Sequence, residues 1–291
     1  MTWRTVVIRE RAKLDYSLNF MTVRQEAGVR KISLGEIYMV IVENTAVSLT
    51  AVLLNELVKN KIKVVFCDEK RNLSSELIQY YGSHDTSLKY KYQLDWTEEC
   101  KQRVWTRIVY EKIYNQMLLL KKLNKDEYKL LGQYLNEIEW NDNSNREGHA
   151  AKVYFNALFG LDFSRNKECF VNAALDYGYS IILSAFNREI VSCGYFTQLG
   201  LCHKNPFNKF NLASDFMEPF RILVDEEVYN LEQSEFSKEH KNILINILNK
   251  TVTIDDKQQT VANAIKIYCR SLFTGLKEGD LEYIKMYKYE L

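Results

Sequence analysis

The sequence contains little proline and little glycine. Its 291 residues include two prolines and 11 glycines, whereas loop-rich all-β proteins use both residue types at their many turns. Both prolines, Pro206 and Pro219, lie between Gly200 and Arg221. Because proline fixes φ and removes a backbone donor, the chain shapes its backbone specifically at these two points. The composition therefore favours long helices and makes the stretch 200–221 the first candidate for a functional site.

Two further patterns are missing, and each absence excludes a class of site. Neither G-x-G-x-x-G nor G-x-x-x-x-G-K-[ST] occurs, so the strand–helix–strand order predicted within residues 37–67 lacks the glycine-rich loop that cradles a phosphate. The six cysteines are scattered without a C-x-x-C pair, and several lie in apolar runs such as residues 64–67. We therefore predict neither a nucleotide-binding fold, nor a zinc ribbon, nor a disulfide framework.

Long apolar runs and charge of one sign are also lacking. No apolar run reaches roughly 18 residues, the length of a membrane span, and the N-terminal residues lack the apolar core of a signal peptide. We therefore expect a soluble, cytoplasmic protein with no membrane partner. The 39 Lys and Arg residues nearly balance the 38 Asp and Glu residues, so a nucleic-acid partner would require positive charge to gather on one face. Composition alone therefore counts mildly against DNA or RNA as a partner.

Hydrophobic periodicity predicts an α+β protein. Residues 13–18 alternate with period two, and residues 37–42 and 64–67 are apolar runs of strand length. A single helix is expected over residues 48–60, with Thr45 or Ser48 as N-cap. From about residue 77 onward the pattern is helical. We predict a small N-terminal β-rich, sandwich-like domain (1–75), a linker region (76–100) and a larger all-α C-terminal domain (101–291).

Several segments of the helical region allow two interpretations. Residues 144–147, Ser-Asn-Arg-Glu, fit a capping box, in which Glu147 would simply cap its own helix over residues 147–159. Residues 89–92 interleave lysine and tyrosine, and would either stack on bases or form an exposed face with half-buried tyrosines. The Tyr- and Lys-rich tail, 281–291, is either disordered or docks on a partner.

The stretch 200–221 combines residue types that suit a metal site. Asp215 and Glu218 are three residues apart and would share one face of a helix. An imidazole from a loop, that of His203, could join these carboxylates around a divalent cation. The alternative is a polar surface loop followed by a charged helix start, and this stretch alone does not decide between the two.

Four segments in order carry a resemblance to a known family. They are REGHAAKVYFNALFG (146–160), NAALDYGYSIILS (172–184), LGLCH (199–203) and LASDFMEPFR (212–221). With a strand-rich unit ahead of them, they make the chain similar over its full length to the CRISPR-associated spacer integrases, the universal adaptation endonucleases of CRISPR systems. LGEIYMVIVENTAVSLT, NREGHAAKVYF and NPFNKFNLASDFMEPFR look like the branch that accompanies single-effector type II systems.

The resemblance implies a catalytic metal site. The three residues that hold the metal in this family match Glu147, His203 and Glu218, while Asp215 matches a supporting acidic position. This set of two carboxylates and one imidazole suits Mg²⁺ or Mn²⁺. His149 would point about 200° away from Glu147 on a helix and is a poor fourth ligand. Candidates for DNA phosphate contacts are Arg146, Lys204, Lys209 and Arg221. Alternatively, each is a surface charge or an ion-pair partner of Glu147, Asp215 or Glu218.

The resemblance also implies a reaction and an assembly. The 3′-hydroxyl of a short double-stranded DNA fragment attacks a phosphodiester at the edge of the CRISPR leader–repeat, without ATP. A homodimer forms through the strand-rich units, and two dimers flank the small second adaptation protein in a heterohexamer, with other type II CRISPR proteins as further partners. The alternatives are a general metal-dependent DNA endonuclease and a non-catalytic DNA-clamping subunit. An enzyme needs the three ligands to meet, whereas in a clamp Glu147 would cap its helix.

Overall fold

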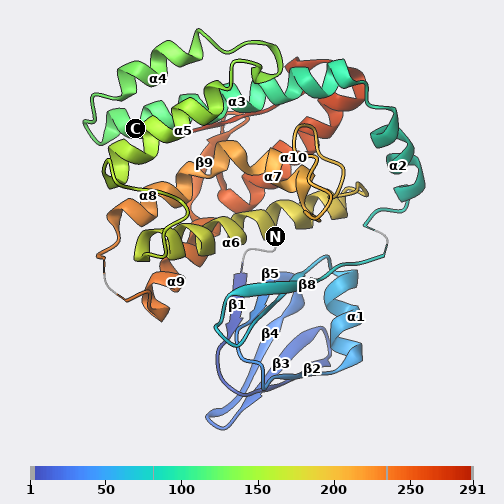
Figure 1. The fold of residues 1–291 in the computed structure, drawn as a ribbon. Helices are drawn as coiled ribbons and strands as arrows, with labels where there is room; N and C mark the ends of the chain where they lie inside the picture. Colours follow the sequence, from blue (N-terminus) through green and yellow to red (C-terminus); the bar gives the residue numbers. More distant parts are fainter. Residues whose placement is uncertain (1–3, 81, 234, 290–291) are drawn as a thin grey trace. The chain divides into compact units, whose positions relative to one another are not determined.

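The structure, a computed structural model, describes residues 4–80, 82–233 and 235–289. The chain divides into two compact units, with the boundary after His84. This boundary lies inside the segment 76–100 predicted as a linker, and residues 86–95 of that segment form the first helix of the second unit. Figure 1 shows a strand-rich first unit and a helical second unit. The prediction of an α+β protein in this order is confirmed.

The first unit contains two four-stranded sheets, ordered β1-β5-β7-β8 and β4-β3-β2-β6, within its described residues. The elements are β1 (Arg4–Ile8), β2 (Lys13–Ser17), β3 (Phe20–Gln25), β4 (Gly28–Ser33), η1 (Leu34–Glu36), β5 (Ile37–Val42), β6 (Ser48–Leu49), α1 (Ala51–Lys59), β7 (Lys63–Cys67) and β8 (Leu73–Leu77). All residues of β5 are buried, as expected for its continuous apolar run. Side chains from both sheets and from α1 share one core, for example Leu14, Val40 and Leu53.

The start of α1 differs from the prediction. Its N-cap is Thr50, whose hydroxyl accepts a hydrogen bond from Leu53 N at 3.3 Å, so the proposals of Thr45 and Ser48 were wrong. The reason is tertiary, because Ser48–Leu49 still pairs in parallel with β2 and the chain stays extended up to that point. A cap can act only where the backbone is released from the sheet.

The second unit is built around α6 (Phe170–Ser192), a helix of 23 residues with buried side chains on most of its sides. Helices α7, α8, α9 and α10 pack against α6. The elements are α2 (Thr86–Asp95), α3 (Glu98–Lys122), α4 (Tyr128–Leu135), η2 (Trp140–Asp142), α5 (Arg146–Phe159), α6 (Phe170–Ser192), α7 (Asn211–Met217), η3 (Glu218–Phe220), α8 (Ile222–Asn230), α9 (Lys238–Asn246), η4 (Ile247–Asn249), β9 (Thr251–Ile254), β10 (Lys257–Thr260), α10 (Val261–Glu278), η5 (Leu281–Tyr283) and β11 (Tyr287–Lys288). No helix among the described residues is long and apolar enough to cross a bilayer.

The second unit also contains a small sheet that the sequence analysis missed. Its order is β10-β9-β11, and Tyr287 and Lys288 pair with Ile254 and Thr253 of β9. The prediction of an all-α domain was therefore incomplete. The tail packs on its own unit, because Tyr287 and Lys288 belong to this sheet and Tyr287 is 3% exposed. Residues 290–291 lie outside the described part of the chain.

The Lys/Tyr segment 89–92 lies on α2. Tyr90 stacks on Phe196 with ring centroids 3.5 Å apart, and Lys89 and Lys277 both lie near the ring of Tyr92. These contacts favour the structural interpretation of the segment, a helix face with half-buried tyrosines, over a base-stacking surface.

Candidate active site

Helix α5 presents Glu147 without using it as a cap. The N-cap Asn145 has a left-handed conformation, φ 53°, and makes no side-chain cap hydrogen bond. Instead the carboxylate of Asp142 accepts hydrogen bonds from Arg146 N at 2.8 Å and Glu147 N at 3.1 Å. The capping-box prediction was therefore wrong, because an acid one turn earlier already satisfies these N–H groups. The Glu147 carboxylate is left to pair with Lys112.

Asp215 organises the loop that carries the histidine. Its fully buried carboxylate accepts hydrogen bonds from three successive backbone N–H groups, those of Leu201 at 2.5 Å, Cys202 at 3.2 Å and His203 at 3.1 Å. The loop can wrap this closely only because residue 200 is glycine. A Cβ at Gly200 would lie 2.4 Å from the His203 carbonyl oxygen and 2.7 Å from Asp215 Oδ2. The spacing in the LG-x-x-H segment thus has a steric explanation.

The same carboxylate orients the imidazole of His203. Nδ1 lies 2.5 Å from Asp215 Oδ1, and this hydrogen bond, opposed by partial burial, raises the pKa of His203. When Nδ1–H donates to the carboxylate, Nε2 carries the lone pair and faces away from Asp215. A carboxylate behind a histidine in this way fixes the ring orientation of many metal ligands. Asp215 therefore has the geometry of the supporting residue that was predicted.

Glu218 is almost completely buried, at 4% exposure, and is surrounded by cations. Oε1 accepts a hydrogen bond from Arg221 Nε at 2.9 Å, and Oε2 lies 2.5 Å from Lys112 Nζ. Burial by itself would raise the pKa of Glu218, but the charges of Arg221 and Lys112 outweigh it and lower the pKa to about 2. Glu218 is therefore ionised at neutral pH although it is buried.

Lys112 joins the two carboxylates, and the sequence analysis missed it. Its ammonium group pairs with both Glu147 and Glu218. Burial would lower the pKa of Lys112, but the two carboxylates outweigh this and raise it. A signal was present in the sequence: Lys112 is four residues after Ile108 and seven after Trp105, so it falls on the apolar stripe of its helix. A lysine at such a position needs a buried anionic partner.

Two of the three predicted ligands, Glu147 and Glu218, thus meet at one lysine ammonium. Both Glu218 and Glu147 contribute to raising the pKa of His203, which reflects their proximity. In the described part of the chain, no three His, Cys, Asp or Glu side chains already surround a common cation position. The donor set nevertheless fits a hard divalent ion. Glu218 Oε2 is buried and has no hydrogen-bond donor aligned with it, although the ammonium is close.

Two neighbouring groups are excluded as ligands. The ring of His149 lies 6.4 Å from that of Tyr134, and its Nδ1 is 3.5 Å from Arg146, so it contacts residues other than the acids of the site. Burial raises the pKa of the Cys202 thiol to about 11. A protonated thiol is a poor ligand for a hard cation.

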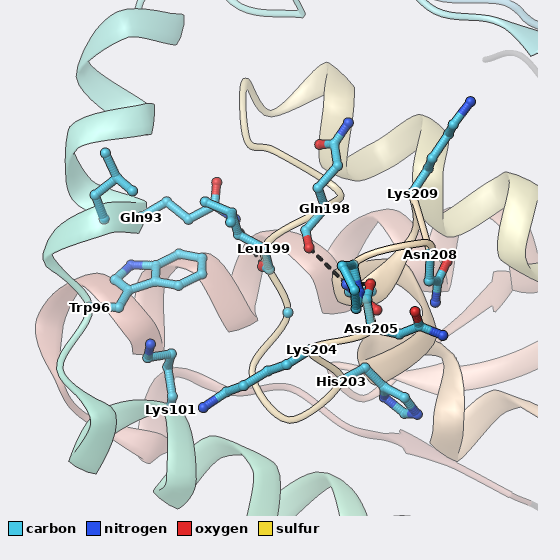
Figure 2. Close-up of a pocket in the computed structure, with 14 residues that line it drawn as sticks. Gln93, Trp96, Lys101, Gln198, Leu199, His203, Lys204, Asn205, Asn208 and Lys209 are labelled. Atoms are coloured by element: carbon cyan, nitrogen blue, oxygen red, sulfur yellow. Dashed lines mark hydrogen bonds between the residues drawn. The ribbon is translucent and has the colours of Figure 1, made fainter.

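A cavity of about 460 Å³ opens beside His203. Figure 2 shows the imidazole at its edge, with amide side chains and lysines along its wall. The lining residues are Gln93, Leu94, Trp96, Lys101, Gln198, Leu199, Gly200, His203, Lys204, Asn205, Pro206, Asn208, Lys209 and Asn211. Asn211 Nδ2 donates to the carbonyl groups of Gln198 and Asn205, at 3.0 and 2.9 Å, and so holds the loop closed. A ligand in this cavity would reach the imidazole.

The four basic candidates occupy two kinds of environment. Lys204 and Lys209 are exposed on the wall of this cavity, Lys204 at 3.5 Å from Glu98 with a side chain 69% exposed. Arg221 and Arg146 instead make ion pairs within the protein. Arg221 lies between Glu218 and the ring of Tyr179, whose centroid is 4.6 Å away.

Arg146 lies at the start of α5. It pairs with Glu137 at 3.1 Å, and its guanidinium lies 5.3 Å from the ring centroid of Tyr134. These contacts link the helix start to α4 and the segment after it, so Arg146 pairs with an acid outside the candidate site.

The backbone that follows Glu218 is held by residues from distant parts of the chain. Asn115 Nδ2 donates to the carbonyl of Pro219 at 3.1 Å, and the Tyr287 hydroxyl donates to the same oxygen at 2.8 Å. Proline has no N–H of its own, so its carbonyl is the group by which the 3₁₀ turn η3 is anchored. Tyr287, from β11, thus fixes the turn that positions Glu218.

Comparison with solved structures defines the class of the fold. A casposase bound to its integration product matches with a TM-score of 0.76 over 97% of this chain and 92% of that chain, at 19% identity. A Cas1 protein from Thermotoga maritima matches with 0.74 over 99% of this chain and 100% of that chain, at 18% identity. A chain of a Cas6-RT-Cas1–Cas2 complex matches with 0.76 over 99% of this chain and 36% of that chain, at 18% identity. The fold is therefore the one shared by casposases and Cas1 proteins.

Comparison of sequences is more specific. The family model described as CRISPR associated protein Cas1 matches residues 5–252. The CRISPR-associated endonuclease Cas1 of Neisseria meningitidis serogroup C (strain 8013) is 32% identical over 292 residues, which cover 98% of this chain and 96% of that protein. The chain belongs to the Cas1 family. The resemblance to the CRISPR spacer integrases is confirmed, while the type II branch stays a prediction.

Proposed function

We propose that the protein is a metal-dependent DNA integrase, which joins the 3′-hydroxyl ends of short foreign DNA fragments to the CRISPR leader–repeat by transesterification. Membership of the Cas1 family and the endonuclease name of the Neisseria relative support phosphodiester chemistry on DNA. The casposase was solved with an integration product, which supports joining of strands over cleavage alone.

One observation carries the proposal. Carboxylates from two separate elements, Glu147 at the start of α5 and Glu218 in η3, converge on one cationic position. The ammonium of Lys112 occupies that position in this structure, and it bridges the two carboxylates as a metal ion could. The buried carboxylate of Asp215 orients the imidazole of His203, whose pKa the charges of Glu218 and Glu147 also raise. A DNA clamp would need none of these groups to meet.

In the proposed site, Glu147, His203 and Glu218 would hold Mg²⁺ or Mn²⁺. When bound, such an ion stabilises negative charge on the phosphodiester and activates the attacking hydroxyl. The 3′-oxygen of the fragment loses its proton and bonds to phosphorus, while the bond from phosphorus to the 3′-oxygen of the target strand breaks and that oxygen takes up a proton. One phosphodiester replaces another, so no nucleotide cofactor is needed.

The chain's own residues would prepare this step. Asp215 keeps the imidazole in one orientation, and Arg221 keeps Glu218 ionised. Lys204 and Lys209 lie on the wall of the cavity beside His203, where they would contact phosphates of the DNA strand that leads to the site. These two exposed lysines would provide local positive charge, although the net charge of the chain is only +1.

We further propose that the protein acts as a homodimer through its strand-rich units, and with a small Cas2-type partner in a heterohexamer. The Cas6-RT-Cas1–Cas2 complex among the structural neighbours supports this partner. Double-stranded DNA would lie across the assembly.

The test is strand transfer of a labelled duplex with free 3′-hydroxyls into a supercoiled plasmid that carries a leader and repeat. With Mn²⁺ and the partner protein, the wild type should form covalent joints, whereas Glu147→Ala and His203→Ala should abolish joining and still bind DNA. Glu127→Ala, which removes an exposed acid whose side chain makes no capping hydrogen bond, serves as the control. Cleavage without joining would favour a general endonuclease. Binding without any metal-dependent product would favour a clamp.

A further inference from the structure

Lys112 is an unusual neighbour for a metal site. It projects from α3, outside every motif that identified the family, and it is buried at 8% exposure. Helix α3 packs against both α5 and η3. The ammonium therefore reaches acids from two other elements at once, with Glu218 Oε2 at 2.5 Å and Glu147 as its second partner.

The two acids need a cation when no divalent ion is present. Arg221 contacts Oε1 of Glu218, so without Lys112 the buried Oε2 would lose its nearest cation. Removing one partner from a buried ion network is strongly destabilising. Lys112 thus performs the electrostatic role of a metal ion in the metal-free protein.

The ammonium and a divalent ion would compete for the same oxygens. Two cations bound to one carboxylate pair lie a few Å apart, and at that distance like charges repel strongly inside a protein. Lysine is suited to exchange, because its charge is compact and its four-carbon stem is flexible. An arginine, with its rigid planar fork, would be harder to move.

We propose that Lys112 is an internal counter-ion that occupies the carboxylate site until a divalent ion displaces its ammonium group, and that it thereby sets the metal affinity. This inference rests on the proposed metal site. Its role is to position and neutralise the acids.

The first experiment measures metal affinity, using the electron paramagnetic resonance signal of free Mn²⁺ during titration of the protein. Lys112→Met removes the charge and keeps a flexible apolar side chain, and it should bind Mn²⁺ at least about tenfold more tightly. Lys129→Met is the matched control, because Lys129 pairs with Asp126 on the surface with a side chain 64% exposed. It should bind Mn²⁺ as the wild type does.

Thermal unfolding gives a second readout. In EDTA, Lys112→Met should melt about 5–10 °C below the wild type, because Glu218 loses a partner. Saturating Mn²⁺ should restore most of this loss, so the variant should gain more from the metal than the wild type does. A purely structural role for Lys112 would leave the loss unchanged by Mn²⁺.

The wild type itself provides a third test that does not depend on how the variant folds. Reductive methylation followed by mass spectrometry should leave Lys112 unmodified in EDTA, and Mn²⁺ should make it reactive, because the displaced ammonium moves out of the acid pair. If Mn²⁺ binds but Lys112 stays protected, and Lys112→Met binds Mn²⁺ no more tightly, the inference is overturned while the metal site stands. If neither protein binds Mn²⁺, the proposed metal site fails and the inference fails with it.

Discussion

Asp215→Asn is the change that most directly tests how the site is built. The carboxylate of Asp215 accepts four hydrogen bonds, two on each oxygen: Oδ2 from Leu201 N and Cys202 N, and Oδ1 from His203 N and Nδ1. Asparagine has nearly the same shape but only one acceptor oxygen. Its NH₂ group would face two N–H donors that then have no acceptor.

The magnitude follows from these contacts. Two lost hydrogen bonds to a buried charged group, at about 1.5–3 kcal/mol each, predict a destabilisation of about 3–6 kcal/mol. For a unit of the size of residues 85–291, this corresponds to a fall in Tm of about 6–24 °C. The asparagine should also lose the effect on the imidazole, so the raised pKa of His203 should fall towards its ordinary value.

A second signature is the pH dependence of stability. Because Asp215 raises the pKa of folded His203 above its unfolded value, the stabilising interaction is fully present below the unfolded pKa of about 6.5 and is lost as pH rises through the folded pKa. The wild type in EDTA should therefore lose stability over this window relative to Asp215→Asn.

The assays are calorimetric unfolding in EDTA between pH 5 and 9 and NMR titration of the His203 C2–H resonance. Asp126→Asn is the control, since the side chain of Asp126 is 87% exposed and should give a change near zero. A variant at Asp215 that melts with the wild type and keeps the His203 pKa would refute the view that this carboxylate organises the loop.

Three further outcomes follow from the structure. Gly200→Ala should lower Tm by several degrees in thermal unfolding, because its Cβ would meet two oxygens at 2.4 and 2.7 Å, whereas Gly35→Ala, whose nearest contact is 3.7 Å, should not. Tyr287→Phe removes the 2.8 Å hydrogen bond to the Pro219 carbonyl and should cost about 1 kcal/mol in urea unfolding; an unchanged midpoint would show that the bond does not anchor the turn. Burial raises the pKa of Asp225 to about 6, so the wild type should lose stability as pH rises from about 4 to 6, and Asp225→Asn should abolish this loss in a series of melting curves.

Those parts of the fold that depend on local pattern were predictable. Strand β5 was recognised from its apolar run, and α5 from its apolar face and from Gly160 at its end. The errors came where distant contacts outweighed local propensity. The cap at Thr50 depends on pairing of Ser48–Leu49 with β2, and the expected box at Glu147 was displaced by Asp142.

The residues of the candidate site were predicted in two ways. His203 and Glu218 were proposed, with Asp215, from the residue types in the stretch 200–221, whereas Glu147 was identified through family resemblance, because nothing in local spacing brings α5 to η3. Lys112 was missed although its position on an apolar helix stripe made it anomalous. Tyr287 could not have been found, because its contact with Pro219 spans 68 residues and leaves no local pattern.

The electrostatics of the site distinguish the roles of the basic residues, which the sequence alone left undecided. Arg221 is needed within the protein: together with Lys112 it holds the pKa of buried Glu218 at about 2, against the effect of burial. Replacing Arg221 would therefore weaken the proposed DNA joining through its effect on Glu218, even if the guanidinium never contacted a phosphate. Lys204 does not stabilise a buried acid. Its contact with Glu98, at 3.5 Å, is exposed, and exposed ion pairs contribute little to stability. A loss of DNA affinity on replacing Lys204 or Lys209, without a loss of stability, is thus attributable to phosphate contact, whereas the same loss at Arg221 is not.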